Sequence, residues 1–321
     1  MRRIKKCTVF LLVLCLLLNL AGCAAAQKPL RVTLVLKTVT EVAEFWGTLL
    51  SGVEKAAEEY GVELKVLTSP REIDIDKQIE LIRQVTADKP DVMILSAADY
   101  DRCAEATEEA IAAGIGVVAI DTDVNAAGRA CFVGSNSYEI GLEMGRAMAS
   151  YLPEGGKVAV IQHMLTTTTG IERTRGVLDA LNEAGNIEIL GSFCCDNSTE
   201  QAQTITTELL SADPEIRGFV CTNEVCNVGA ANALVDLGLG GKVYVVGCDN
   251  SQRQIQFLEQ NIIQAIVTQR PFNMGYMAVQ QAVRVANGEQ TDDFVEVSCV
   301  LITRENMYTQ ENQKLLFPVL H

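Results

Sequence analysis

Glu58-Glu59-Tyr60-Gly61-Val62-Glu63-Leu64-Lys65-Val66-Leu67 has a counterpart later in the chain, Leu181-Asn182-Glu183-Ala184-Gly185-Asn186-Ile187-Glu188-Ile189-Leu190. Each copy reads as the end of an amphipathic helix, a terminating glycine and a β-rich strand. Lys89-Pro90-Asp91-Val92 and Asp213-Pro214-Glu215-Ile216 repeat at a similar offset, near 124 residues. A repeat of this length is the size of one domain, so it predicts two α/β lobes of the same design. The alternative is one large doubly wound domain.

Strand-like and helix-like runs alternate along the chain. In the first half, strands are expected at 32–36, 62–67, 92–95 and 117–120, with helices at 45–60, 75–85 and 103–113. The longer runs repeat apolar residues at helical spacing, and the short runs are rich in β-branched residues. Strands separated by helices imply βαβ units, and therefore a parallel sheet covered on both faces.

The residues after the strands form the candidate binding region, because open parallel sheets bind ligands beyond the carboxyl ends of their strands. No phosphate loop, no GxGxxG fingerprint and no nucleophile–base pair with supporting spacing occurs there. The chain has only two histidines, His163 and His321, and no paired CxxC motif. We therefore predict no catalytic residue, no metal site and no cofactor.

The strand ends carry planar polar groups and two aromatic rings. Asp, Asn and Gln side chains follow several strands, an Arg-Thr-Arg-Gly segment begins at Arg173, and Phe45-Trp46 lies after the first strand. Carboxylates, amides and guanidinium groups match vicinal hydroxyls, and an aromatic face suits the C–H side of a sugar ring. This composition favours a neutral polyol as the ligand.

Five segments at these strand ends resemble a known family. They are Val117-Val118-Ala119-Ile120-Asp121, Arg173-Thr174-Arg175-Gly176, Asp213-Pro214 through Asn223-Glu224, Val245-Val246-Gly247-Cys248-Asp249 and Ala265-Ile266-Val267-Thr268-Gln269. Through them, residues 30–303 resemble the type 1 periplasmic sugar-binding proteins, close to the ribose-binding branch. The resemblance implies two doubly wound parallel-sheet lobes joined by a three-strand hinge. It also implies a sugar captured between the lobes and delivered to an ABC permease.

The resemblance assigns ligand-binding roles position by position. Phe45 and Trp46 become the pair that stacks on the sugar ring, and the hydroxyl-binding residues are Asp121, Arg173, Asn223, Asp249 and Gln269. Six of the seven have an alternative: Asp121 and Asp249 as helix N-caps, Arg173 in a surface ion pair, Trp46 in the core, Asn223 and Gln269 as solvated loop groups. Four further strand-end residues are assigned structural roles instead: Lys37, Thr122, His163 and Asn197.

The chain departs from the ribose-binding pattern at several strand ends. Thr122 stands where ribose binders have Arg, and Asp196 or Asn197 replaces a stacking aromatic of the second lobe. Segment 37–44 is longer than usual, and the threonine run 166–169 has no recognised counterpart. These departures disfavour ribose itself as the ligand, but they remain compatible with another sugar or polyol.

Residues 1–22 read as an export signal, with four cationic residues and an apolar run of about 12 residues, too short to span a bilayer. Leu20-Ala21-Gly22-Cys23 resembles the lipobox of bacterial lipoproteins. That resemblance implies lipidation of Cys23, a lipidated linker at 23–29 and a location on the extracytoplasmic face of the cell membrane. We expect an N-terminal lobe of residues 30–134 plus 271–297, and a C-terminal lobe and tail of residues 135–270 plus 298–321.

Without the signal, 22 Lys and Arg stand against 41 Asp and Glu, a net charge of about −19. Such a chain is repelled by nucleic acid and by anionic lipid, so a lipid anchor would have to hold it at a membrane. The expected partners are a small sugar or polyol and an ABC permease, and we expect a monomer. The alternative is a sugar-sensing receptor that presents its ligand to a membrane kinase or chemoreceptor. A DNA-binding regulator and an enzyme are disfavoured.

Eight cysteines remain beyond Cys23, and several lie in apolar strand-like runs. Buried cysteine behaves as a small apolar residue, so most are expected to be core thiols. The adjacent Cys194 and Cys195 are the exception. For them the sequence leaves two alternatives, a reactive thiol or a disulfide to another cysteine.

Overall fold

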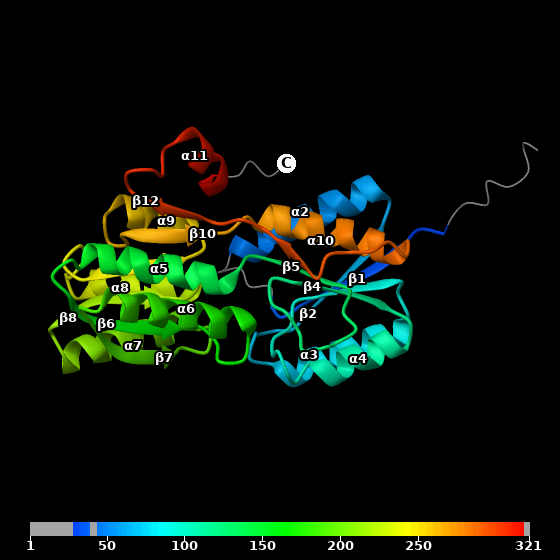
Figure 1. Cartoon of the computed structure of the whole chain (residues 1–321), viewed down its shortest axis with the longest axis horizontal. Helices are drawn as coiled ribbons and strands as arrows, with labels where there is room; N and C mark the ends of the chain where they lie inside the picture. Colours follow the sequence, from blue (N-terminus) through cyan, green and yellow to red (C-terminus); the bar gives the residue numbers. More distant parts are fainter. Residues whose placement is uncertain (1–27, 39–43, 318–321) are drawn as a thin grey trace, which may run out of the picture.

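The computed structural model describes residues 28–38 and 44–317, so residues 1–22, Cys23 and most of segment 37–44 lie outside the described residues. The described chain forms two α/β lobes that lie side by side, each built on a six-stranded sheet (Figure 1). The predicted two-lobe fold is therefore confirmed, and the single large domain is wrong. Over these ranges, no helix is both long and apolar enough to span a bilayer.

The N-terminal sheet has the strand order β11-β5-β4-β3-β1-β2, and all neighbours are parallel. Its strands are β1 (Arg31–Leu36), β2 (Glu63–Thr68), β3 (Val92–Leu95), β4 (Gly116–Ile120), β5 (Cys131–Gly134) and β11 (Phe294–Glu296). Helices α2 (Glu44–Tyr60) and α10 (Pro271–Ala286) cover one face, and α3 (Ile75–Asp88) and α4 (Ala104–Ala112) cover the other. Burial from both faces explains why β3 is apolar throughout.

The C-terminal sheet has the matching order β12-β10-β9-β8-β6-β7. Its strands are β6 (Gly156–Gln162), β7 (Ile187–Cys194), β8 (Ile216–Cys221), β9 (Tyr244–Cys248), β10 (Ala265–Thr268) and β12 (Val300–Thr303). Only β12 runs antiparallel to its neighbour among the described strands. Helices α5 (Ser137–Tyr151) and α6 (Thr168–Ala184) cover one face, and α7 (Thr199–Ala212), α8 (Glu224–Asp236) and α9 (Gln252–Glu259) cover the other. Helix α11 (Gln310–Leu316) follows β12.

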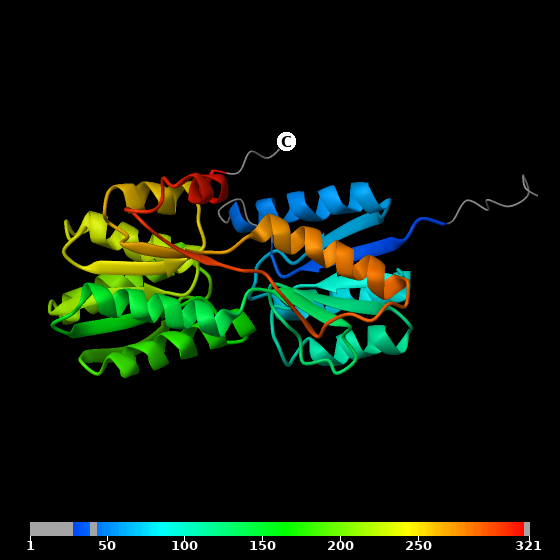
Figure 2. The same cartoon turned by 45° about the horizontal axis from the view of Figure 1, so that its top comes forward.

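The chain passes from one sheet to the other at three places. The crossings run from β5 to α5, from β10 to α10 and from β11 to β12. Figure 2 shows these connections in the narrow region between the two lobes, with the last one drawn in orange-red. Short connections of this kind permit the lobes to rotate about a hinge.

Two glycines let α5 and α6 pack backbone against backbone. A Cβ on Gly141 would lie 2.2 Å from the carbonyl oxygen of Arg173, and one on Gly176 would lie 2.2 Å from that of Tyr138. No larger residue fits without separating the helices. This close approach fixes the position of α6, and α6 carries Arg173 at the edge of the lobe.

Polar residues after the strands begin the helices of the C-terminal lobe. The side chains of Thr167, Ser198, Asn223 and Ser251 each accept a hydrogen bond from the backbone N–H three residues later. Such caps satisfy helix N–H groups that otherwise lack a partner. They hold the helix starts, and the residues beside them, at the carboxyl edge of the sheet.

Candidate functional site

A cavity of about 40 Å³ lies between the two lobes, at the carboxyl ends of both sheets. The N-terminal lobe lines it with Lys37, Phe45, Trp46, Glu72 and Asp121. The C-terminal lobe lines it with His163, Thr169, Arg173, Asn197, Asn223, Glu224, Val225, Asp249 and Gln269. All seven residues expected to bind ligand therefore line one cavity, and Thr122 does not.

Asp121 and Asp249 occupy equivalent places in the two lobes. They directly follow β4 and β9, and both have a left-handed backbone, with φ of 63° and 71°. Their N–H groups continue the sheet, since that of Asp121 donates to Val133 and that of Asp249 donates to Val267. The N-cap alternative is wrong for both, because Ser251 caps α9 and no described helix starts at Asp121. The turn ends each strand and leaves its carboxylate in the cavity wall.

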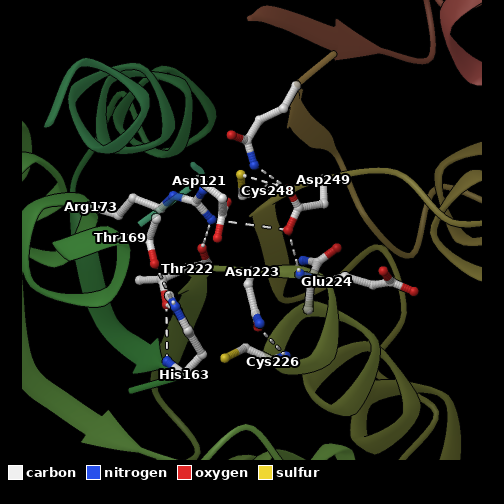
Figure 3. A network of polar contacts seen from close by, with 12 residues as sticks. Asp121, His163, Thr169, Arg173, Thr222, Asn223, Glu224, Cys226, Cys248 and Asp249 are labelled. Carbon is white, nitrogen blue, oxygen red and sulfur yellow. Dashed lines mark hydrogen bonds and ion pairs between the residues drawn. The ribbon is translucent and has the colours of Figure 1, made fainter. Parts of the chain in front are cut away.

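Arg173 brings a cation into the cavity from α6. The side chain is buried, and its Nη1 donates to the carbonyl oxygen of Thr222 at 2.8 Å. The same nitrogen lies 4.0 Å from Oδ2 of Asp249 (Figure 3). Its Nε is buried and has no hydrogen-bond partner among the described residues. The alternative of a surface ion pair is therefore wrong for Arg173. Its Nε is a hydrogen-bond donor that remains available to a ligand.

Gln269 orients Asp249. Its Nε2 donates to Oδ1 of Asp249 at 2.7 Å, and the backbone N–H of Glu224 donates to Oδ2 at 3.2 Å. Gln269 is 2% exposed, so the solvated-loop alternative is wrong for this residue. Two donors on different elements fix the plane of the Asp249 carboxylate, which is what recognition of a hydroxyl pair requires.

Asn223 starts a hydrogen-bond chain that crosses between the lobes. Its Oδ1 caps α8 by accepting from the N–H of Cys226, and its Nδ2 donates to Oδ1 of Asn197 at 2.9 Å. Nδ2 of Asn197 then donates to Oε2 of Glu72 in the other lobe at 2.8 Å. Asn223 is thus half-buried and bonded rather than solvated. Asn197, assigned a structural role from the sequence, lies in the cavity wall.

Lys37 forms a buried charge cluster with two acids of its own lobe. Its Nζ lies 2.9 Å from Oε1 of Glu72 and 3.3 Å from Oδ2 of Asp121. Burial lowers the pKa of Lys37, but the charges of Glu72 and Asp121 outweigh burial, so the pKa ends above its ordinary value. Lys37 therefore stays cationic and positions both carboxylates. The sequence prediction missed Lys37 and Glu72 as members of the site.

The two aromatic residues have different surroundings. Trp46 is 5% exposed, packs in the core of the N-terminal lobe and also lines the cavity, so the core alternative is confirmed and its stacking on a sugar ring stays a prediction. Phe45 is half-buried and lies edge-on to Trp46, with ring centroids 5.1 Å apart. Phe45 also borders a larger cavity, of about 560 Å³, between α2, the start of α10 and α11. The smaller cavity is the candidate site, because the strand ends and buried charges converge there.

His163 is a neutral member of the wall. Its Nδ1 lies 2.7 Å from Oγ1 of Thr222, and its Nε2 lies 3.2 Å from Oγ1 of Thr169. Burial, and then the charges of Arg173 and Lys37, hold its pKa well below the usual value. Both ring nitrogens have partners, so the structural role predicted for His163 agrees with its contacts. The described residues contain no group of His, Cys, Asp and Glu that fits a metal ion.

The threonine run 166–169 joins the lobes beside the cavity. The carbonyl oxygen of Thr166 accepts from the N–H of Tyr100, and its hydroxyl donates to the carbonyl oxygen of Ala98, both at 3.0 Å. The hydroxyl of Thr168 accepts from the N–H of Asp123 at 3.1 Å. These bonds connect protein groups directly, so the run contributes to holding the lobes together.

Glu224 faces like charges at the junction of the lobes. The side chain is 4% exposed, and its Oε2 has no hydrogen-bond partner among the described residues. Burial, followed by the charge of Asp249 and a smaller effect of Glu44, raises the pKa of Glu224 to about 8. Glu44 in turn accepts from the N–H of Gln252 at 3.2 Å, from the opposite lobe. At neutral pH Glu224 is therefore mostly protonated.

We expect the free energy of unfolding to fall as pH rises between about 4.5 and 8. Over that window the native protein keeps a proton on Glu224 that the unfolded chain has lost, so stability is full below 4.5 and is lost toward 8. The slope from this group is about 1.4 kcal/mol per pH unit at most. Urea unfolding of the wild type and of Glu224→Gln at several pH values measures this slope. An equally steep slope in the variant would contradict the assignment to Glu224.

Comparisons with known proteins agree with this geometry. The family model described as a periplasmic binding protein domain matches residues 33–290. The D-allose-binding periplasmic protein of Escherichia coli is 25% identical over 90% of this chain and 96% of its own length. The D-ribose/D-allose-binding protein of Pseudomonas aeruginosa is 26% identical over 86% and 89%. A crystal structure of a sugar transporter from Clostridium phytofermentans is 30% identical, with a TM-score of 0.79 over 85% of this chain and 98% of that one.

Proposed function

The chain belongs to the periplasmic binding protein family, and from that premise we propose that it binds a monosaccharide or related polyol between its lobes and delivers it to an ABC permease. The Escherichia coli and Pseudomonas aeruginosa relatives are named for binding allose or ribose. A structure from Actinobacillus succinogenes, 27% identical with a TM-score of 0.80, is titled with bound D-allose. These names support the sugar class. Members of this family bind substrates rather than convert them, so we also propose that the chain has no catalytic activity.

The observation that carries the proposal is the convergence of hydrogen-bonding groups from both lobes on one cavity. Asp121 comes from the N-terminal lobe, whereas Asp249, Gln269 and the guanidinium of Arg173 on α6 come from the C-terminal lobe. Two carboxylates on opposite walls accept from hydroxyls, and the partnerless Nε of Arg173 donates to one. Leaving a buried donor such as Nε of Arg173 unpaired costs free energy, so a polyol that pairs with it stabilises the closed lobes.

The closed cavity is small for a sugar. A volume of about 40 Å³ accommodates about three waters, since each needs roughly 10–15 Å³. In our proposal the lobes therefore rotate apart about the three crossings to admit the ring, and nearby side chains rearrange as they close. The closed shape is then what the permease recognises.

We propose that the protein acts as a monomeric lipoprotein on the extracytoplasmic face of the cell membrane. The support is sequence alone: the export signal and the Leu20-Ala21-Gly22-Cys23 segment, which lie outside the described residues. Lipidation of Cys23, with palmitate among its acyl chains, anchors the protein. Stable anchoring needs more than one acyl chain. The mature chain has a net charge of about −19, so its overall charge does not favour binding to anionic lipid without the anchor.

A fluorescence titration tests the proposed function directly. Trp46 is the only tryptophan of the chain and lines the cavity, so its emission should respond when a ligand enters. We expect the mature chain to show a saturable change with one member of a panel of pentoses, hexoses and polyols.

The control is Trp46→Phe, which removes the signal but keeps an aromatic ring beside Phe45. In that variant the same sugar should still raise the melting temperature. If no member of the panel changes either the tryptophan emission or the melting temperature, a sugar or polyol is rejected as the ligand.

A further inference from the structure

Two buried thiols face each other in the C-terminal lobe, each within three residues of a residue that lines the cavity. Sγ of Cys195 lies 3.4 Å from Sγ of Cys226, and both side chains are fully buried. Cys195 follows the end of β7, and Cys226 lies in the first turn of α8. A disulfide bond is about 2.05 Å long, so the two sulfur atoms need to approach by little more than 1 Å.

The loop that follows Cys195 is held in an unfavourable backbone conformation. Asp196 and Asn197 have φ of 48° and 53°, and two consecutive non-glycine residues in this region carry strain. The N–H of Asn197 donates to the carbonyl oxygen of His163, and its side chain makes the cross-lobe bond to Glu72. Part of the C-terminal wall of the cavity thus depends on a strained loop.

The geometry points to a disulfide between Cys195 and Cys226, which we propose forms outside the cytoplasm by exchange with a small-molecule or protein disulfide. Cys195 attacks the donor disulfide and releases one thiol, which leaves a mixed disulfide. Cys226 then attacks that bond and releases the second thiol. The two protein thiols lose two hydrogens in total, and the donor disulfide gains them. Compartments outside the cytoplasm are where such bonds persist.

The surroundings favour Cys195 as the first nucleophile. The hydrogen bond from Cys226 lowers the pKa of Cys195, whereas burial raises that of Cys226 well above its usual value. Asp196, the next residue, is exposed, so a local opening of the loop is enough to admit a small disulfide. The bond would tie this strained loop to the helix that carries Asn223, and so stiffen the wall that holds Asn197 and Asn223.

Peptide mapping tests the bond. The full mature chain is incubated with glutathione disulfide, denatured in N-ethylmaleimide and cut with trypsin, which releases fragments 176–217 and 218–242. We expect the two fragments to be linked, at a mass two hydrogens below their sum, and to separate on reduction. Two separate fragments whose cysteines carry only N-ethylmaleimide or glutathione would overturn the proposal.

Each fragment holds a second cysteine, Cys194 or Cys221, so matched variants identify the pair. The link should survive in Cys194→Ser and in Cys221→Ser, and disappear in Cys195→Ser and in Cys226→Ser. A link that depends on Cys194 or Cys221 would also overturn the proposal. The bridged wild type should melt about 5–10 °C above its reduced form. None of these measurements requires a sugar, so the outcome is independent of the proposed function.

Discussion

Asp249→Ala is expected to weaken sugar binding about 100-fold or more while the protein stays folded. The substitution removes an acceptor for ligand hydroxyls and leaves Nε2 of Gln269 and the N–H of Glu224 without their partner. It also removes the carboxylate that lies 4.0 Å from Arg173. Two charge-assisted hydrogen bonds, at about 1.5 kcal/mol each, correspond to that factor. Isothermal titration calorimetry with the sugar found by fluorescence, together with circular dichroism melting, measures both parts.

Asp292→Ala is the matched control, because Asp292 is exposed and has no hydrogen bond or ion pair in the described structure. Its affinity should equal that of the wild type. Asn223→Ala, which breaks the link to Asn197 and the cap of α8, should weaken binding about tenfold. Wild-type affinity in both Asp249→Ala and Asn223→Ala would contradict the assignment of the site.

Gly141→Ala is expected to lower the free energy of unfolding by about 3 kcal/mol, and to weaken sugar binding as well. The added methyl group would lie 2.2 Å from the backbone oxygen of Arg173, so α6 must move away from α5. Overpacking of this kind costs about 1–3 kcal/mol, and here the obstacle is backbone rather than a flexible side chain. Movement of α6 shifts Arg173 relative to Thr222 and Asp249. Denaturant unfolding and calorimetry report the two effects.

Gly47→Ala makes the same chemical change where nothing obstructs it. Gly47 lies in α2, and no heavy atom outside its own stretch of helix lies within 4 Å of the place that its Cβ would occupy. Alanine is the better helix former, so this variant should be more stable than the wild type by about 0.5–1 kcal/mol. If the two variants have the same stability, the close approach of α5 and α6 is not what limits the size of residue 141.

The fold was predictable because its signals are local and repeated. The helix predicted at 45–60 is observed as α2, and the strand predicted at 92–95 is observed as β3. Asp121 and Asp249 each close an apolar strand segment in the sequence, and the structure gives both the same left-handed turn. A pattern that recurs in two places is a stronger signal than either copy alone.

Lys37, Glu72 and Glu224 escaped prediction for a shared physical reason. Each is a charged residue, and charged residues are typical of the solvated surface. Their burial depends on distances between elements remote in the chain, such as the 2.9 Å between Lys37 and Glu72. A signal was present for two of them, since Lys37 directly follows β1 and Glu224 is the third residue after β8. The loop that holds Glu72 gave none.

The direct bonds between the lobes bear on how well a transporter distinguishes a loaded receptor from an idle one. Thr166 with Ala98, Thr168 with Asp123, and Asn197 with Glu72 all join protein to protein, so none of these bonds needs a ligand to bridge it. They raise the share of empty molecules that adopt the closed shape, which improves the apparent affinity. Those closed but empty molecules also produce a background signal, because a permease that recognises shape alone would respond to them. Capture at low sugar concentration and wasted ATP hydrolysis would therefore rise together in this receptor.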